Sequence, residues 1–173
     1  LEEEILNFGK ETSQPKFNPF FITKMISNMA AGQISIRFGL KGISYAVASA
    51  CAVANNAIGS AFDAIRLGRA DAILAGGTEA SICQSAIAGF NAMKALSTAN
   101  ENPVQASRPF DANRTGFVAG EGAGILLLEE LEHAQKRGAK IYCELVGYGS
   151  ASDAYHVAAT HPEGEGAIAA MQQ

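Results

Sequence analysis

Residues 43–77 constrain the fold more than any other stretch, because two apolar runs flank a helix-like run. The runs "ISYAVASAC" and "DAILAGG" are typical of buried strands, and the Gly76-Gly77 pair is expected to end the second one. Between them, "AVANNAIGSAFDAIRLG" has its apolar residues at helical spacing, with Gly68 in place to end the helix. This order predicts a βαβ crossover, in which the two strands are parallel neighbours.

The rest of the chain continues the alternation of helices and strands. Helical spacing is predicted for residues 22–36, ended by Gly39, and again for residues 85–96. A long loop rich in Asn, Pro and Ser follows at residues 97–116. A strand leading into a helix is expected over residues 120–139, and another strand over residues 140–153. The pattern predicts the α/β class.

Composition narrows the class of protein. Of 173 residues, 48% are hydrophobic and 17% charged, which favours a globular chain with a sizeable core, or part of a larger domain. The net charge of −4 and the lack of a Lys/Arg run give no reason to expect nucleic acid as a partner. No apolar stretch is long enough to cross a membrane, and no signal peptide is visible. We therefore expect a cytoplasmic protein. A non-Met first residue and a helix-like last stretch suggest a fragment.

Cys51 stands where the first predicted strand becomes the helix. The start of a helix has unpaired N–H groups and a partial positive charge, which stabilise a thiolate and lower the pKa of a thiol. The same N–H groups could hold a developing oxyanion. Cys51 is thus a candidate nucleophile, although a small buried cysteine is an alternative. Cys83 and Cys143 are placed in a predicted helix and strand and are expected to be structural. Three widely spaced cysteines make neither a disulfide framework nor a zinc site.

Several motifs in this order resemble one family. They are "ASAC", "GRADAILAGGTEA", "KALSTANENPVQASRPFDANRTGFVAGEGAGILLLEELEHAQKRGAKIY" and "SDAYHV". From about Pro19 to its end, the chain resembles the elongating β-ketoacyl-acyl-carrier-protein synthases of bacterial fatty acid synthesis. The resemblance implies a thiolase-like layered α/β fold with βαβ units and a mixed sheet covered by helices, incomplete here. Residues 1–139 would form most of the half carrying the nucleophile, and residues 140–173 would begin the other half.

The resemblance also implies a reaction. The cysteine takes an acyl chain from acyl carrier protein as a thioester, and malonyl-carrier protein then loses carbon dioxide and attacks it. The product is a β-ketoacyl chain two carbons longer. No metal or redox cofactor is implied, because the phosphopantetheine arrives on the carrier protein.

The family completes its triad with two histidines in glycine-flanked motifs. His133, His156 and His161 do not match these motifs. His133 belongs to an amphipathic helix and is expected on the surface, and His161 in a surface loop. His156, in "SDAYHV", matches a family motif near the active-site entrance. The 173-residue piece alone is therefore expected not to complete the condensation.

Other site residues follow from the resemblance in the same way. Phe117 matches a phenylalanine that gates the nucleophile, and Phe90 a residue near the substrate channel. Phe21 and Ile22 match positions that reach toward the partner subunit's acyl pocket. For Phe117, Phe21 and Ile22, an ordinary place in the core is the alternative.

Docking of an acidic carrier protein requires basic residues. Lys16 and Lys94 match basic docking positions, whereas Pro15 departs from the family pattern. Ala158 and Ala159 also replace hydroxyl residues that often meet the pantetheine arm, although Thr160 could compensate.

A homodimer is expected to form through pairing of the strand at residues 43–49 with its twin. Since this strand leads into the cysteine, dimerisation and active-site geometry would be coupled.

Alternatives to a fatty acid synthase remain open at this stage. A polyketide ketosynthase uses the same chemistry, and a degradative thiolase shares the fold. A non-catalytic partner of the chain-length-factor type is disfavoured by Cys51, which such proteins lack. The chain could also be a folded piece with no activity of its own.

Overall fold

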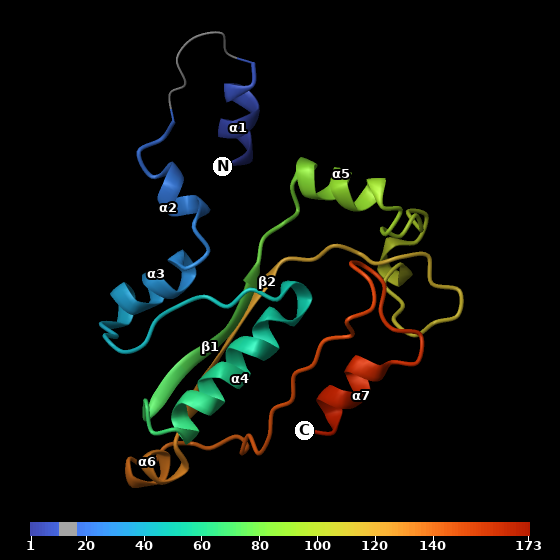
Figure 1. The fold of residues 1–173 in the computed structure, drawn as a ribbon. Coiled ribbons are helices and arrows are strands. Elements are labelled where there is room, and N and C mark those ends of the chain that lie inside the picture. The colour runs from blue at the N-terminus through green and yellow to red at the C-terminus, as the bar shows by residue number, and fades with distance from the viewer. Residues whose placement is uncertain (11–16) are drawn as a thin grey trace. The chain divides into compact units, whose positions relative to one another are not determined.

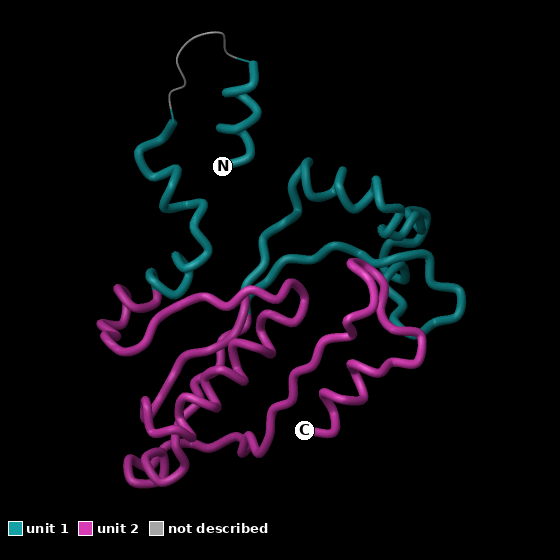
Figure 2. Tube along the Cα trace, viewed as in Figure 1, with its two compact units in different colours: residues 1–33, 78–123 teal, residues 34–77, 124–173 magenta. Residues whose placement is uncertain are grey.

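The computed structural model describes residues 1–10 and 17–173, which divide into two compact units (Figure 2). Unit 1 contains Leu1–Gln33 and Thr78–Ala123, and unit 2 contains Ile34–Gly77 and Gly124–Gln173. This division follows contacts between residues, whereas the expected boundary near residue 139 concerns the two halves of a larger fold. That boundary stays a prediction.

The described ranges contain short helices and one pair of strands (Figure 1). Unit 1 holds α1 (Glu2–Phe8), α2 (Phe21–Met25), α5 (Gln84–Ala92) and the 3₁₀ turn η2 (Pro103–Gln105), and α3 (Met29–Phe38) crosses into unit 2. Unit 2 holds the 3₁₀ turn η1 (Ala50–Ala52), α4 (Val53–Arg66), α6 (Leu131–Lys136) and α7 (Glu165–Met171). Most of β1 (Ala72–Glu79) and β2 (Gly122–Glu129) also belongs to unit 2. Within these ranges, no helix has both the length and the apolar character needed to cross a bilayer.

The helix predicted after Cys51 is confirmed as α4. It ends at Arg66, and Gly68 takes the left-handed conformation (φ 65°) that closes many helices. The helix predicted over residues 22–36 is present in two parts, α2 and α3, because the chain is extended at Ile26 (φ −73°, ψ 133°).

Strand β1 pairs with β2 rather than with residues 43–49. The Glu130 N–H donates to the Asp71 carbonyl at 2.9 Å, so the end of β2 lies beside the start of β1 and the two strands run antiparallel. The predicted end of the strand at Gly76-Gly77 is wrong, since β1 continues to Glu79. Gly76 does not form a turn. Its lack of a side chain lets the backbones of β1 and β2 approach closely, because the Gly124 carbonyl oxygen occupies the place where a side chain would begin.

Two other predicted strands are absent. Residues 43–49 and residues 140–153 are irregular and belong to no β ladder in the described part of the chain. An apolar run becomes a strand only when a neighbouring backbone pairs with its N–H and C=O groups, and the described residues supply none for these two. The βαβ crossover therefore lacks its first strand, and the dimer through residues 43–49 stays a prediction.

The buried core of the described residues is small. Its apolar members are four alanines, namely Ala61, Ala75, Ala106 and Ala134. In β2, which confirms the strand predicted there, Leu126 and Leu127 are each 55% exposed. The reason is that two strands offer little area, so the described elements leave most of β2 uncovered.

Glu129, at the end of β2, ties this strand to α6. Its carboxylate accepts two hydrogen bonds from Arg137, at 2.7 and 2.6 Å, and lies 2.5 Å from His133 Nδ1. His133 was expected on the surface and is half exposed, but it also takes part in this cluster. The hydrogen bonds from Arg137 lower the pKa of Glu129 from 4.5 to about 2.

We expect Glu129→Gln to destabilise the intact protein above pH 4.5, and the difference from wild type to shrink as the pH falls toward 2. The sign follows from linkage: a carboxyl whose pKa is lower in the folded state than in the unfolded state stabilises fully above the unfolded pKa. This stabilisation is lost as the pH falls toward the folded pKa, because the unfolded state takes up the proton first. Urea unfolding at pH 7 and pH 3 measures both differences.

A matched control is Glu132→Gln in α6, whose carboxylate lies 3.5 Å from Lys136 with both side chains exposed. Its effect should stay below about 0.5 kcal/mol. A Glu129→Gln difference that is equal at pH 7 and pH 3 would contradict the linkage.

Candidate active site

Cys51 lies in the tight turn that introduces α4. It is the middle residue of η1, in which the Ala52 N–H donates to the Ser49 carbonyl at 3.0 Å. The thiol is free and exposed, so the alternative of a buried cysteine is wrong for the described chain. Helix α4 begins two residues later, and its first N–H groups point away from the helix toward this turn.

The turn requires an unusual backbone at Ala50. Its φ is 46°, in the left-handed region that residues other than glycine rarely adopt. On the far side of Cys51, the first turn of α4 rests on β1, where a side chain on Gly77 would begin 3.0 Å from the Ala54 Cβ. Small residues thus let the chain reverse sharply and hold the thiol at the surface.

Ala50→Gly should raise the free energy of unfolding of the intact protein, by up to about 1 kcal/mol, because glycine adopts this φ without steric cost. Ala50→Val should lower it by more, since a β-branched residue fits the region poorly. The same alanine-to-glycine change at Ala52, where φ is −88°, should destabilise instead. Chemical denaturation measures all three, and equal signs at both positions would contradict a strained Ala50.

Cys83 differs from its prediction, because it also stands at a helix start. It is the N-cap residue of α5. The nearby Glu2 carboxylate already accepts the Ser85 N–H at 2.6 Å, and this bond lowers the pKa of Glu2. A thiolate at Cys83 would face that negative charge, which sets it apart from Cys51. Cys143 is exposed and in an irregular segment, not the predicted strand.

In unit 1, the two predicted channel residues Phe117 and Phe90 lie together. Their rings meet edge to face with centroids 5.1 Å apart. Phe117 is fixed by its backbone, since its N–H donates to the Ala95 carbonyl and its carbonyl accepts the Ser97 N–H. Phe117 lines a hollow of about 540 Å³ together with Arg108 and Arg114. Both phenylalanines stay partly exposed, so neither is an ordinary core residue here.

Among the other predicted residues of unit 1, Phe21 is partly exposed and Ile22 and Lys94 are exposed. Phe21 and Ile22 begin α2, where the Phe21 ring packs on Phe17 at 4.4 Å and Ile22 is 57% exposed. Lys94 follows α5 and is exposed, with φ at 54°. Lys16 and Pro15 lie outside the described residues.

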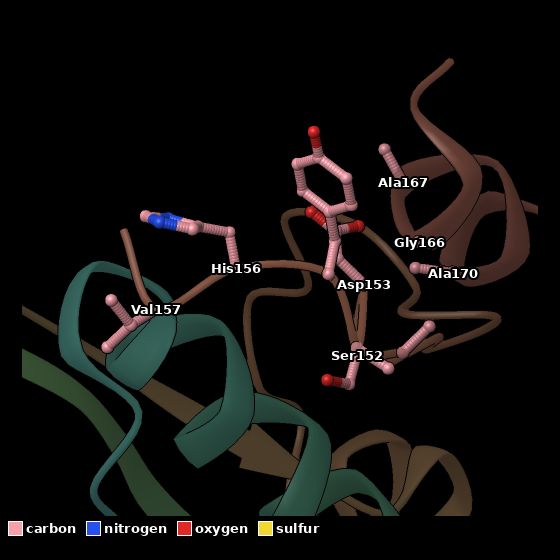
Figure 3. A pocket seen from close by; sticks show the side chains of 10 residues that line it. Ser152, Asp153, His156, Val157, Gly166, Ala167 and Ala170 are labelled. Carbon is pink, nitrogen blue, oxygen red and sulfur yellow. The ribbon is translucent and has the colours of Figure 1, made fainter. Parts of the chain in front are cut away.

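In unit 2, His156 lines an open hollow of about 650 Å³ (Figure 3). Its Nδ1 accepts the N–H groups of Ala158 and Ala159 at 3.1 and 3.0 Å. Nδ1 is therefore unprotonated, and a neutral His156 carries its proton on Nε2. Figure 3 shows the ring on the opposite side of the hollow from the α7 residues Gly166 and Ala167.

Sequence reasoning missed two residues that organise this region. Asp153 Oδ2 accepts the His161 N–H at 3.0 Å and so closes the loop around the hollow. Tyr148 contacts α4, as described below. The "SDAY" motif was a signal for Asp153, whereas Tyr148 had none because its partners are about 90 positions away. In the described part of the chain, no cluster of three His, Cys, Asp or Glu side chains could hold a metal ion.

Known proteins match this chain over most of its length. The β-ketoacyl synthase N-terminal domain family matches residues 3–134. The chain is 56% identical to 3-oxoacyl-[acyl-carrier-protein] synthase 2 of Rhizobium meliloti (strain 1021) and 55% identical to that of Staphylococcus aureus, in each case over 91% of this chain. It spans 38% and 39% of the length of these two relatives.

Solved structures agree with the sequence matches. A β-ketoacyl synthase from Burkholderia phymatum STM815 superposes with a TM-score of 0.87 at 37% identity, covering 98% of this chain and 43% of that one. A ketosynthase bound to its type II polyketide acyl-carrier protein gives a TM-score of 0.83 at 41% identity, covering 88% of this chain and 38% of that one.

These matches define the class as a thiolase-like α/β fold of the condensing-enzyme type. The chain belongs to the β-ketoacyl synthase family and contains residues of its N-terminal domain. The resemblance in the sequence motifs and the predicted fold class are both confirmed.

Proposed function

We propose that this chain supplies the nucleophile of a 3-oxoacyl-acyl-carrier-protein synthase, which lengthens acyl chains by two carbons. The observation that carries the proposal is the exposed thiol of Cys51, held in a strained turn at the start of α4 in a chain of this family. The activity and its substrates are proposed for a protein of the relatives' length. These relatives are more than twice as long as this chain.

The first half-reaction is transfer of an acyl group. The Cys51 thiolate attacks the carbonyl carbon of an acyl thioester on the carrier protein's phosphopantetheine. A carbon–sulfur bond forms to Cys51, the bond to the pantetheine sulfur breaks, and the pantetheine thiolate leaves and takes up a proton. The N–H groups at the start of α4 are suited to stabilise the oxyanion formed during the attack.

The second half-reaction joins two carbons to the acyl group. The malonyl thioester loses carbon dioxide, and the carbanion that remains attacks the carbonyl of the Cys51 thioester. The Cys51 thiolate leaves, and the β-ketoacyl chain stays on the carrier protein. The family's two histidines would assist this step, and none of the three described histidines matches them. We therefore propose that the 173-residue chain alone does not catalyse the full condensation. The chemistry requires no metal or redox cofactor.

We further propose acyl carrier protein as the partner, with Lys94 and Lys16 as basic docking residues. The solved complex of a related ketosynthase with its carrier protein supports this partner. From the family resemblance, we propose Phe117 and Phe90 as gating and channel residues, and Phe21 and Ile22 as residues that face the acyl pocket of a second subunit. His156, beside the hollow of about 650 Å³, would stand at the entrance.

A polyketide ketosynthase is the second candidate, favoured by the structural match to a polyketide complex. Fatty acid elongation is the better proposal, because identity to the fatty acid synthases reaches 56% against 41% for the polyketide enzyme.

Acylation of the intact protein tests the proposal. The protein is incubated with acyl carrier protein bearing a saturated acyl chain, and its mass and peptides are then mapped. We expect one acyl group on Cys51, released by hydroxylamine as a thioester should be. Acylation of Cys83 or Cys143, or none at all, would contradict the proposed function.

A further inference from the structure

Tyr148 makes two contacts with α4, the helix that follows Cys51. Its hydroxyl donates to Asn56 Oδ1 at 2.7 Å in a partly buried bond. Its ring carbons fill the place where a side chain on Gly59 would begin, and Gly59 is buried. Asn56 and Gly59 are three residues apart and therefore share one face of the helix. The ring and the hydroxyl of Tyr148 thus rest on the same face of α4.

The next two residues attach the chain to α7. The carbonyl oxygen of Ala170 in α7 occupies the place where a side chain on Gly149 would begin. The Ser150 N–H and carbonyl both bond to the Gln173 side-chain amide, each at 3.1 Å. The short segment of residues 148–150 therefore contacts α4 through one residue and α7 through the next. All of these contacts lie in unit 2.

The segment leads directly into the hollow where His156 lies. Residues 151–157 line one side of that hollow, and Gly166, Ala167 and Ala170 of α7 line the other (Figure 3). At the opposite end of the contact, Gly59 is six residues into α4, about 9 Å along the helix axis from its start. Because a helix moves as a stiff rod over this distance, a shift at Gly59 displaces the turn that holds Cys51.

We propose that Tyr148 is a positioning residue, which fixes the Cys51 end of α4 relative to the hollow lined by residues 151–157. A rod is held in one orientation by contacts at two separate points. Ala54 against Gly77 supplies the first, and Tyr148 against Asn56 and Gly59 supplies the second. The inference rests on the proposed function, because it assumes that an acyl group reaches Cys51 from this hollow.

The test compares two reactions of Cys51 in the intact protein. Tyr148→Phe keeps the ring on Gly59 and removes the hydroxyl. Acyl transfer from acyl carrier protein should slow about fivefold, the ratio that corresponds to one ordinary hydrogen bond. Alkylation by iodoacetamide, a small reagent with no fixed approach, should change less than about twofold. Tyr142→Phe is the matched control, since Tyr142 is 85% exposed and its loss of a hydroxyl should change neither rate.

Variants of Asn56 distinguish a role of the Tyr148–Asn56 hydrogen bond in positioning α4 from a general loosening of the fold. Asn56→Leu should slow acyl transfer as Tyr148→Phe does, whereas Asn56→Asp retains an acceptor and should restore most of the rate. The double variant Tyr148→Phe/Asn56→Leu should be no slower than either single one, because both remove the same bond.

An unchanged acyl transfer in Tyr148→Phe, or an equal change in both reactions, would overturn the positioning role. Failure of the wild-type protein to become acylated on Cys51 would instead count against the proposed function, so the two failures are distinguishable.

Discussion

Replacing Cys51 by serine is expected to slow acyl transfer by at least about a thousandfold, because a hydroxyl lacks the nucleophilic power of a thiolate. The turn should survive the change. Serine differs from cysteine by one atom, and Cys51 is exposed, so no packing is lost. Quenched time courses with acylated acyl carrier protein, in which the acyl-enzyme is quantified by mass spectrometry, measure the rate of acyl transfer.

Cys143→Ser is the matched control, since Cys143 is also free and exposed. Cys83→Ser is a second control, because it removes a thiol at a helix start that lies beside the Glu2 carboxylate. Both variants should become acylated at the wild-type rate. If either loses acylation while Cys51→Ser keeps it, the nucleophile is not Cys51.

Gly76→Ala should cause the largest loss of stability, about 2–3 kcal/mol, because the new methyl group would overlap the Gly124 carbonyl oxygen on the paired strand. The overlap involves backbone on both sides, so no side-chain rotation can relieve it. The strands must separate or the sheet must bend near β1, on which the first turn of α4 rests. Urea unfolding of the intact protein measures the loss.

Gly124→Ala provides the matched control in the partner strand, because nothing lies within 4 Å of the place where its side chain would begin. The change should be neutral or stabilise by about 0.5 kcal/mol, as expected for alanine in place of glycine in a strand. Equal losses at both positions would show that glycine flexibility, rather than close approach, explains the sequence at Gly76.

Helices were easier to predict than strands in this chain. The apolar spacing of α4 and the glycine after it are local signals, so the helix and its end could be predicted. A strand depends on a partner that the local sequence does not contain. This explains why residues 43–49 were predicted as a strand and why the pairing of β1 with β2 was missed.

The candidate site shows the same limit. The place of Cys51 before a helix was visible in the alternation of patterns, and motif resemblance selected Phe117 and Phe90, which the structure brings together. The left-handed Ala50 could not be predicted, because alanine carries no signal for that conformation. The contact of Tyr148 with Asn56 could not be predicted either, since the two residues are far apart in the sequence.

The adjacency of Tyr148 and Gly149 restricts how this segment can vary in length. The Tyr148 ring packs on α4. The next residue, Gly149, has no side chain, and its backbone packs directly on α7. A single inserted residue between them would place a side chain against the Ala170 carbonyl or draw the ring off Gly59. Insertions should therefore be rejected there. They should be accepted more readily in the interior of the long loop at residues 97–116, away from its ends, where the Ser97 and Thr115 hydroxyls are hydrogen-bonded to each other.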